Sequence, residues 1–191
     1  MGTHGHYPDR YPKTYDYFNN VADIKTENRS FLATNSYGKD KINEYDNAIR
    51  YNDMIISEII SALKEKKTYS YLLYVSDHGE EVYDSRRYFS HQESNATPFM
   101  FEIPFVVWLS PEYRAVHFNN FEVFKTQENR SYQTDDIIHS ILDLSHIVLS
   151  QFDSTKSIFN AGFLKEKRHI GPYDYDTLKL DFEGFKKDLK L

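Results

Sequence analysis

The most constraining feature of the sequence is a short apolar run that ends in a cluster of ionisable side chains. Residues 69–75 read Tyr-Ser-Tyr-Leu-Leu-Tyr-Val, a run too short for a helix and rich in residues that strands prefer. The residues that follow are Ser76, Asp77, His78, Gly79 and Glu80. Because ligands bind at the carboxyl ends of strands in open α/β sheets, we expect a functional site at this strand end.

Asp77 and His78 together offer a carboxylate and an imidazole. Within a strand they would point to opposite faces, but Gly79 allows the backbone to turn so that both reach one ion. This pair suits zinc or manganese better than calcium or magnesium, which prefer shells made of oxygen atoms. The alternative interpretation is that Asp77 and Glu80 are ordinary turn residues and that His78 is a polar neighbour.

Other histidines differ in how near they lie to this strand end. His4 and His6 flank Gly5 in a polar N-terminal stretch, and His91 follows Asp77 closely enough for a loop to fold back over the strand end. An unpaired surface histidine is the commonest explanation for any one of them. We keep that explanation for the four histidines in the second half, which are His117, His139, His146 and His169.

The apolar spacing predicts an α/β architecture. Residues 41–66 and 135–149 have the periodicity of amphipathic helices, with Asp40 and Thr134 as their expected N-caps. Residues 102–109 form a second apolar run. Because both apolar runs are nearly continuous, we expect buried strands in a mostly parallel sheet. Around this core of residues 41–149 we expect a long functional loop over residues 1–40 and a tail over residues 150–191.

Composition excludes several classes of protein. The chain has 191 residues, with 23 Lys and Arg against 29 Asp and Glu, and its formal net charge of −6 argues against a nucleic-acid partner. The absence of cysteine excludes disulfides, thiolate zinc sites and a cysteine nucleophile. The sequence contains no run of roughly 18–20 apolar residues, the length that a membrane-spanning helix needs.

Five motifs, taken together and in order, resemble the catalytic domain of bacterial phosphoethanolamine transferases, which belong to the alkaline phosphatase and sulfatase superfamily. The resemblance extends to about Leu149 and implies a sandwich with a mostly parallel central sheet flanked by helices. The motifs are Met-Gly-Thr-His-Gly at 1–5 with Tyr11-Pro12, Tyr-Asp-Asn-Ala-Ile at 45–49, Tyr-Val-Ser-Asp-His-Gly-Glu at 74–80, Ser90-His91 and Ile-Pro-Phe at 103–105.

The resemblance implies a zinc-dependent activity. Phosphoethanolamine would pass from phosphatidylethanolamine to a cell-envelope acceptor, either lipid A or a core sugar of lipopolysaccharide, through a phosphothreonine intermediate. It also implies that the parent protein lies in the bacterial inner membrane with this domain on the periplasmic side.

Carried over by position, the resemblance gives five residues a role. Asp77 and His78 would be zinc ligands, while His4 and His91 would contact the phosphoryl group or a second zinc. His91 would also protonate the leaving oxygen. Glu80 would orient His78 or bind the amine of the substrate.

The family's nucleophilic threonine and glutamate ligand lie upstream of the Gly-Thr-His-Gly segment. We therefore expect this chain to be the C-terminal part of the catalytic domain, with no nucleophile of its own and no activity when isolated. Thr3, Thr14 and Thr97 do not fit the expected strand-to-helix turn.

Two alternatives remain open at the level of sequence. In the first alternative, the chain belongs to a sulfatase or a phosphoglycerol transferase of the same superfamily, whose strand-end motif is similar in outline. Otherwise it is a non-catalytic interaction module, in which an exposed sheet edge pairs with a second copy to form a homodimer.

Overall fold

The computed structural model describes residues 3–20, 35–92, 94, 96–117 and 125–188. Positions 1, 2 and 21–34 of the predicted loop over residues 1–40 therefore lie outside the described residues. The chain forms two compact units, one of Met1–Ser110 with Thr177–Leu191 and the other of Pro111–Asp176. The predicted boundaries at residues 40 and 149 stay predictions.

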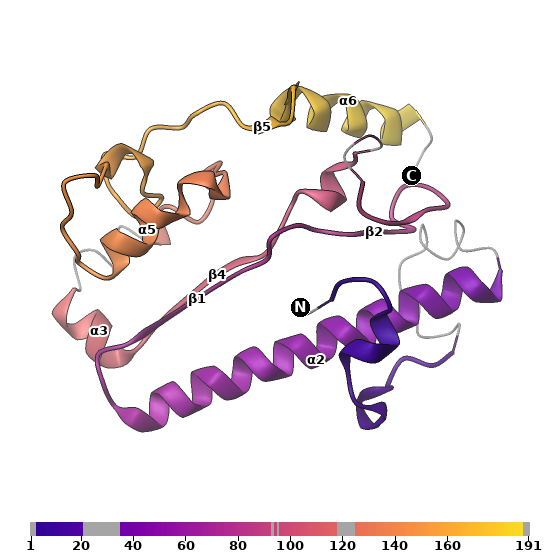
Figure 1. Ribbon diagram of the computed structural model, residues 1–191, viewed down its shortest axis with the longest axis horizontal. Helices are drawn as coiled ribbons and strands as arrows, with labels where there is room; N and C mark the ends of the chain where they lie inside the picture. The colour runs from indigo at the N-terminus through magenta and orange to yellow at the C-terminus, as the bar shows by residue number, and fades with distance from the viewer. Residues whose placement is uncertain (1–2, 21–34, 93, 95, 118–124, 189–191) are drawn as a thin grey trace. The chain divides into compact units, whose positions relative to one another are not determined.

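The first unit is built on one long helix and one strand pair, shown in Figure 1. Among the described residues, two short 3-10 turns precede the helix, and a small hairpin and the 3-10 turn η5 lie between the two long strands. In chain order these elements are η1 (Tyr7–Arg10), η2 (Lys13–Tyr15), α2 (Ser36–Lys66), β1 (Tyr71–Val75), β2 (Glu81–Val82), β3 (Phe89–Ser90), η5 (Pro98–Met100) and β4 (Phe105–Leu109).

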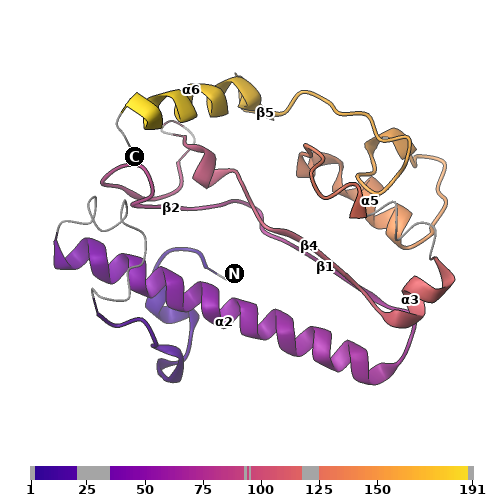
Figure 2. The ribbon, with the colours of Figure 1, turned by 180° about the vertical axis from the view of Figure 1, so that it is seen from behind.

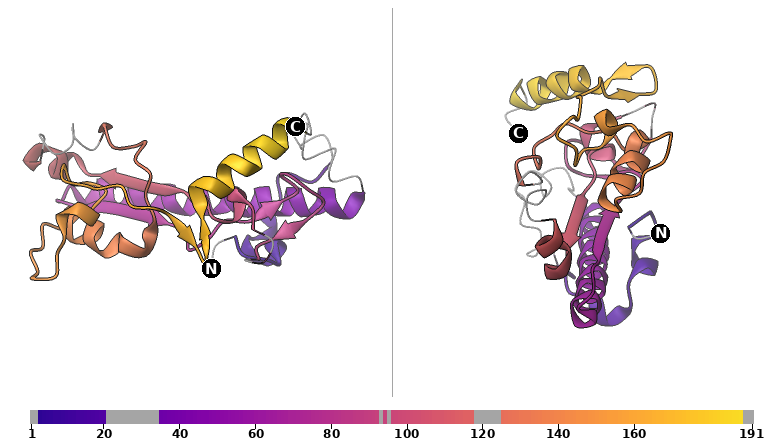
Figure 3. Two further views of the ribbon diagram at one scale, coloured as in Figure 1. Left: turned by 90° about the horizontal axis from the view of Figure 1, so that it is seen from above. Right: turned by 90° about the vertical axis from the view of Figure 1, so that its left-hand side faces the viewer.

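The second unit is made of short elements, and its last hairpin leads directly into a C-terminal helix, as Figure 3 shows. Its buried centre is Tyr113, whose hydroxyl donates to the carbonyl oxygen of Leu144 at 2.7 Å. The elements are α3 (Pro111–Val116), η6 (Thr134–Asp136), α5 (Ile137–Leu144), η7 (Ser154–Lys156), β5 (His169–Ile170), β6 (Tyr173–Asp174) and α6 (Tyr175–Asp188), the last of which continues into the first unit.

Helix α2 begins five residues before the predicted start. Its N-cap is Asn35, whose side-chain oxygen accepts a hydrogen bond from the backbone N–H of Gly38 at 2.8 Å, so the prediction of Asp40 as the cap is wrong. The expected apolar face is buried only in the first half of the helix. Ile42 is fully buried, whereas Ile59 is 46% exposed.

The prediction that the two long strands run parallel is wrong for this pair. Strand β1 pairs antiparallel with β4, with Leu73 opposite Val107. The two strands are also less buried than predicted, because β1 is partly buried along its whole length and Val106 of β4 is 40% exposed. A continuous apolar run does not determine strand direction. Between Val75 and Phe105 the described residues contain only a hairpin and 3-10 turns, without the crossover helix that a parallel connection needs. Pairing of a strand edge with a second copy stays a prediction.

The second predicted helix is shorter than expected. Helix α5 ends at Leu144, and Val148 lies beyond it at 88% exposure. Thr134 is the first residue of the preceding 3-10 turn, so its predicted role as the helix cap is wrong. The tail, for which no periodicity was expected, contains a hairpin and helix α6. None of the helices in the described ranges is long and apolar enough to cross a bilayer.

The core of the first unit lies between the N-terminal turns, the first half of α2 and the β2–β3 hairpin. Seen from behind in Figure 2, the N-terminal segment lies against this half of α2. Burial of these side chains holds the N-terminal loop beside the hairpin, although the two are far apart in sequence. The buried residues are Tyr7, Ile42, Ala48, Val82 and Tyr83.

Candidate metal centre

The segment after β1 is held in place by a close approach of two backbones. The backbone N–H of Gly79 donates to the carbonyl oxygen of Met100 at 2.9 Å. A Cβ atom at position 79 would lie 2.2 Å from the carbonyl oxygen of Phe99, a distance that no side chain tolerates. Glycine is therefore required here, and the contact fixes the backbone next to His78.

The register of the β2–β3 hairpin brings Glu80 and His91 together. Glu81 pairs with Ser90, so the residues just outside the ladder, Glu80 and His91, become neighbours. The Nδ1 atom of His91 lies 3.0 Å from Oε1 of Glu80, whose side chain is 5% exposed. Glu80 therefore contacts His91, whereas the resemblance implied that it would orient His78 or bind the amine of the substrate.

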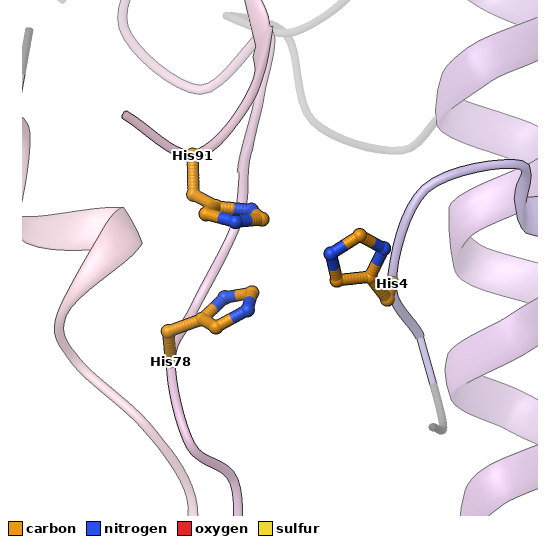
Figure 4. Close-up of side chains that lie close together, drawn as sticks. All are labelled: His4, His78 and His91. Carbon is orange, nitrogen blue, oxygen red and sulfur yellow. The ribbon is translucent and has the colours of Figure 1, made fainter. Parts of the chain in front are cut away.

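His4 approaches the same place from the N-terminal loop. The guanidinium of Arg10 holds this loop, because its Nε donates to the carbonyl oxygen of His4 at 3.0 Å and its Nη2 donates to that of Gly5 at 3.2 Å. The side chain of His4 is exposed, and its ring is turned toward the other two histidines in Figure 4.

His4, His78 and His91 form a cluster in which one nitrogen of each ring lies within 4.8 Å of the others. The ring centroid of His4 is 5.7 Å from that of His78 and 5.2 Å from that of His91, and both contacts are edge-on. Figure 4 shows the three rings around one common space. Three segments that are separate in the sequence thus supply one potential ligand each.

The cluster has the hydrogen-bonding pattern of a metal site. His78 Nδ1 lies 2.9 Å from the carbonyl oxygen of Gly79, and His91 Nδ1 lies 3.0 Å from the Glu80 carboxylate. When each Nδ1 carries its proton toward that acceptor, each Nε2 has a lone pair for coordination. Metal-binding histidines usually donate their second ring N–H to a carbonyl or carboxylate in this way. Three imidazoles are also a donor set that fits zinc.

Asp77 lies outside this group. Its side chain is exposed, and its Oδ1 accepts from the backbone N–H of His78 at 3.1 Å. Loss of hydration alone would raise the pKa of Asp77, but backbone N–H groups and the neighbouring His78 outweigh it and lower the pKa below its usual range. Asp77 is therefore a carboxylate next to the cluster, and the structure does not bring it together with His4 and His91.

Two contacts escaped the sequence analysis. The buried Tyr7 donates its hydroxyl to Glu80 Oε2 at 2.8 Å, but nothing in the sequence distinguishes it from the other tyrosines. Burial, and then the hydrogen bond to Glu80, raise the pKa of Tyr7 far above its ordinary value, so it remains a donor. The second contact is internal to the hairpin region, where buried Thr97 donates to the fully buried carboxylate of Glu81.

Comparison with known proteins finds relatives that are named phosphoethanolamine transferases. Phosphoethanolamine transferase EptC of Escherichia coli K12 is 35% identical over 187 residues, which cover 93% of this chain and 31% of that protein. Phosphoethanolamine transferase CptA of Salmonella typhimurium has the same identity and coverage. The chain therefore spans less than a third of the length of these curated relatives.

Solved structures match the fold. The C-terminal periplasmic domain of EptC from Escherichia coli has a TM-score of 0.84 and 33% identity, covering 93% of this chain and 51% of that one, and a second structure of it is a complex with zinc. These matches confirm the predicted α/β fold class. A membrane-protein relative is the lipooligosaccharide phosphoethanolamine transferase EptA of Neisseria meningitidis, with a TM-score of 0.64 and 26% identity over 82% of this chain and 29% of that one.

The sequence profile of the sulfatase family matches residues 1–147, which is most of the chain and includes all three clustered histidines. This match shows that the chain belongs to the sulfatase family.

Proposed function

We propose that this chain forms the histidine-bearing part of the catalytic domain of a zinc-dependent phosphoethanolamine transferase. The observation that carries the proposal is the cluster of His4, His78 and His91, in which two rings already have acceptors at Nδ1. The names of the relatives and the zinc complex of the EptC domain support it.

His78 is the proposed zinc ligand at the strand end, with Asp77 as its carboxylate partner. His4 and His91 would bind the phosphoryl group or a second zinc. Bound zinc would neutralise charge on the phosphoryl oxygens and lower the pKa of an attacking hydroxyl. Imidazole and carboxylate ligands must be deprotonated to coordinate, and the Asp77 carboxyl, whose pKa lies below its usual range, is ionised at neutral pH.

In a state in which no metal occupies its Nε2, His91 has a second proposed task, which is proton transfer. Its Nδ1 faces the Glu80 carboxylate, so the ring is held with Nε2 on the side away from Glu80. The proton on Nε2 would then pass to the diacylglycerol oxygen as the bond from phosphorus to that oxygen breaks. Glu80 keeps this ring orientation and is itself too buried to meet a large substrate.

The proposed donor is phosphatidylethanolamine and the proposed acceptor is lipid A or the lipopolysaccharide core, at the periplasmic side of the inner membrane. Among the relatives is a Kdo(2)-lipid A phosphoethanolamine 7''-transferase of Escherichia coli, 30% identical over 112 residues. We assign no threonine of this chain as the nucleophile. Thr97, one of the threonines considered, is buried and donates to Glu81. The isolated chain should therefore give no transfer.

Zinc titration by calorimetry tests the metal part of the proposal. We expect stoichiometric binding by the wild-type chain, and binding at least about 10-fold weaker in His78→Ala and in Asp77→Ala. His169→Ala is the matched control, because that side chain is exposed and lies in the other unit. A wild-type chain that binds no zinc, or a His78→Ala variant that binds as well as wild type, would contradict it.

A chimera tests the reaction. This chain would replace the matching part of Escherichia coli EptC, and mass spectrometry of the lipopolysaccharide would detect phosphoethanolamine. We expect modification by the chimera and by its His169→Ala variant, and none by its His78→Ala variant. Hydrolysis of an aryl sulfate in place of transfer would instead favour the sulfatase alternative, and incorporation of phosphoglycerol would favour the phosphoglycerol transferase.

A further inference from the structure

The short 3-10 turn η1 contacts two sides of the histidine cluster at once. Its first residue, Tyr7, and its last residue, Arg10, both reach groups that determine where a histidine lies. Neither side chain supplies a metal ligand. The turn is anchored by Tyr7, which is 1% exposed and belongs to the core of this unit.

Tyr7 acts on His91 through Glu80. The Tyr7 hydroxyl donates to Oε2 of Glu80 at 2.8 Å, while Oε1 of the same carboxylate lies 3.0 Å from His91 Nδ1. A carboxylate that is nearly removed from water needs hydrogen-bond donors for both oxygens. If the Tyr7 hydroxyl is removed, Oε2 is left unpaired, and the carboxylate gains by turning toward solvent and away from His91.

Arg10 acts on His4 through the backbone. Two different nitrogens of its guanidinium donate to the carbonyl oxygens of His4 and Gly5, at 3.0 and 3.2 Å. Bonding of this kind fixes the direction of the chain more firmly than a single bond does. It matters here because the His4 side chain is exposed and has little packing to hold it.

We propose that η1 is the positioning element of the histidine cluster, with Tyr7 setting the ring of His91 through Glu80 and Arg10 setting the backbone of His4. Both are positioning residues and neither touches the metal. The role in metal affinity rests on the proposed function. The orientation of the His91 ring does not, because it is a property of the chain without metal.

The first test reads the tautomer of His91 by nitrogen NMR on the full metal-free chain at about pH 8, where an ordinary imidazole is neutral. In the wild type we expect the proton on Nδ1, facing Glu80. In Tyr7→Phe we expect a clear gain of the Nε2–H tautomer. Tyr74→Phe is the matched control: its hydroxyl accepts a 2.7 Å hydrogen bond from Asn52, and neither partner belongs to the cluster. An unchanged His91 tautomer in Tyr7→Phe would overturn the proposal that Tyr7 sets the ring of His91.

The second test measures zinc affinity. We expect Tyr7→Phe to weaken binding about 10-fold, with Tyr74→Phe equal to wild type. Arg10→Gln alters a partly exposed side chain and should still fold, and it should also weaken binding. A zinc affinity equal to that of the wild type in Arg10→Gln would overturn the proposal that Arg10 sets the backbone of His4.

The two tests separate the two proposals. If the wild type binds no zinc but the His91 tautomer still depends on Tyr7, the metal part of the proposed function fails and the positioning role stands. If zinc binds and neither Tyr7→Phe nor Arg10→Gln changes the affinity or the tautomer, the positioning role fails and the proposed function stands.

Discussion

The imidazole rings of His78 and His91 lie 3.8 Å apart between centroids, with their planes 35° from parallel. Two positively charged rings at this distance would repel each other, whereas two neutral rings can share a cation. We therefore expect zinc to stabilise the folded chain. At a free zinc concentration 100 times the dissociation constant, the free energy of unfolding should rise by about 2.7 kcal/mol.

Thermal unfolding with and without zinc, followed by chelation, checks this expectation. The unfolding midpoint should rise with zinc and return to its starting value after chelation. In His91→Ala the rise should be smaller, and in His169→Ala it should equal that of the wild type. A rise of the same size in His91→Ala would remove His91 from the metal site.

Two glycines that follow clustered histidines should respond differently to the same substitution. In Gly79→Ala the new Cβ would meet the carbonyl oxygen of Phe99 at 2.2 Å, so the backbone must shift and stability should fall by about 2–3 kcal/mol. In Gly5→Ala the new Cβ would meet nothing within 4 Å, so stability should barely change. Urea unfolding of the two variants measures both effects. Equal stabilities would show that the close approach at Gly79 is not maintained in solution.

The side chain of Asn47 joins α2 to the N-terminal segment and should be a large contributor to stability. It is fully buried. Its oxygen accepts from the backbone N–H groups of Tyr17 at 3.0 Å and Phe18 at 2.9 Å, and its nitrogen donates to Asp16 Oδ1 at 3.0 Å. Asn47→Ala should lower the free energy of unfolding by about 3 kcal/mol, measured by urea unfolding.

Asn52→Ala is the control for this substitution. Asn52 lies on the same helix, is only partly buried, and donates to the hydroxyl of Tyr74. Asn52→Ala should lower the free energy of unfolding by about 1 kcal/mol. If both substitutions cost the same, the network around Asn47 would not hold the N-terminal segment as the structure indicates.

The sequence predicted the strand that leads to His78 because strand propensity and the following ligand types are local features. Comparison with the family supplied His4 and His91, whose convergence depends on contacts between distant segments. Neither the antiparallel direction of β4 nor the partial exposure of the strand pair could be predicted, since a continuous apolar run fits strands of either direction. The start of α2 was placed five residues late because Asn35 and Asp40 are both good N-caps, and the apolar pattern begins only after the second.

The positioning contacts were out of reach for a different reason. That His91 lies opposite Glu80 is decided by the register of the β2–β3 hairpin, which pairs Glu81 with Ser90. A shift of one residue in that register would place Ser90 or Gln92 opposite Glu80 in place of His91. Tyr7 likewise reaches Glu80 across 73 positions of sequence, and no pattern near either residue signals the contact.

A pair of stacked histidines in the second unit should make the stability of the chain sensitive to acid. The rings of His117 and His146 lie 3.8 Å apart, 15° from parallel. Burial, and then the charge of a protonated His146, lower the pKa of His117 below 6.5. The unfolded chain therefore binds a proton more readily than the folded chain, so stability is lost as the pH falls through about 6.5 and below.

In urea unfolding between about pH 7.5 and 5, His117→Gln should lose less stability than wild type, and His169→Gln should follow the wild type. Equal losses in wild type and His117→Gln would show that the stacked pair does not carry this pH dependence.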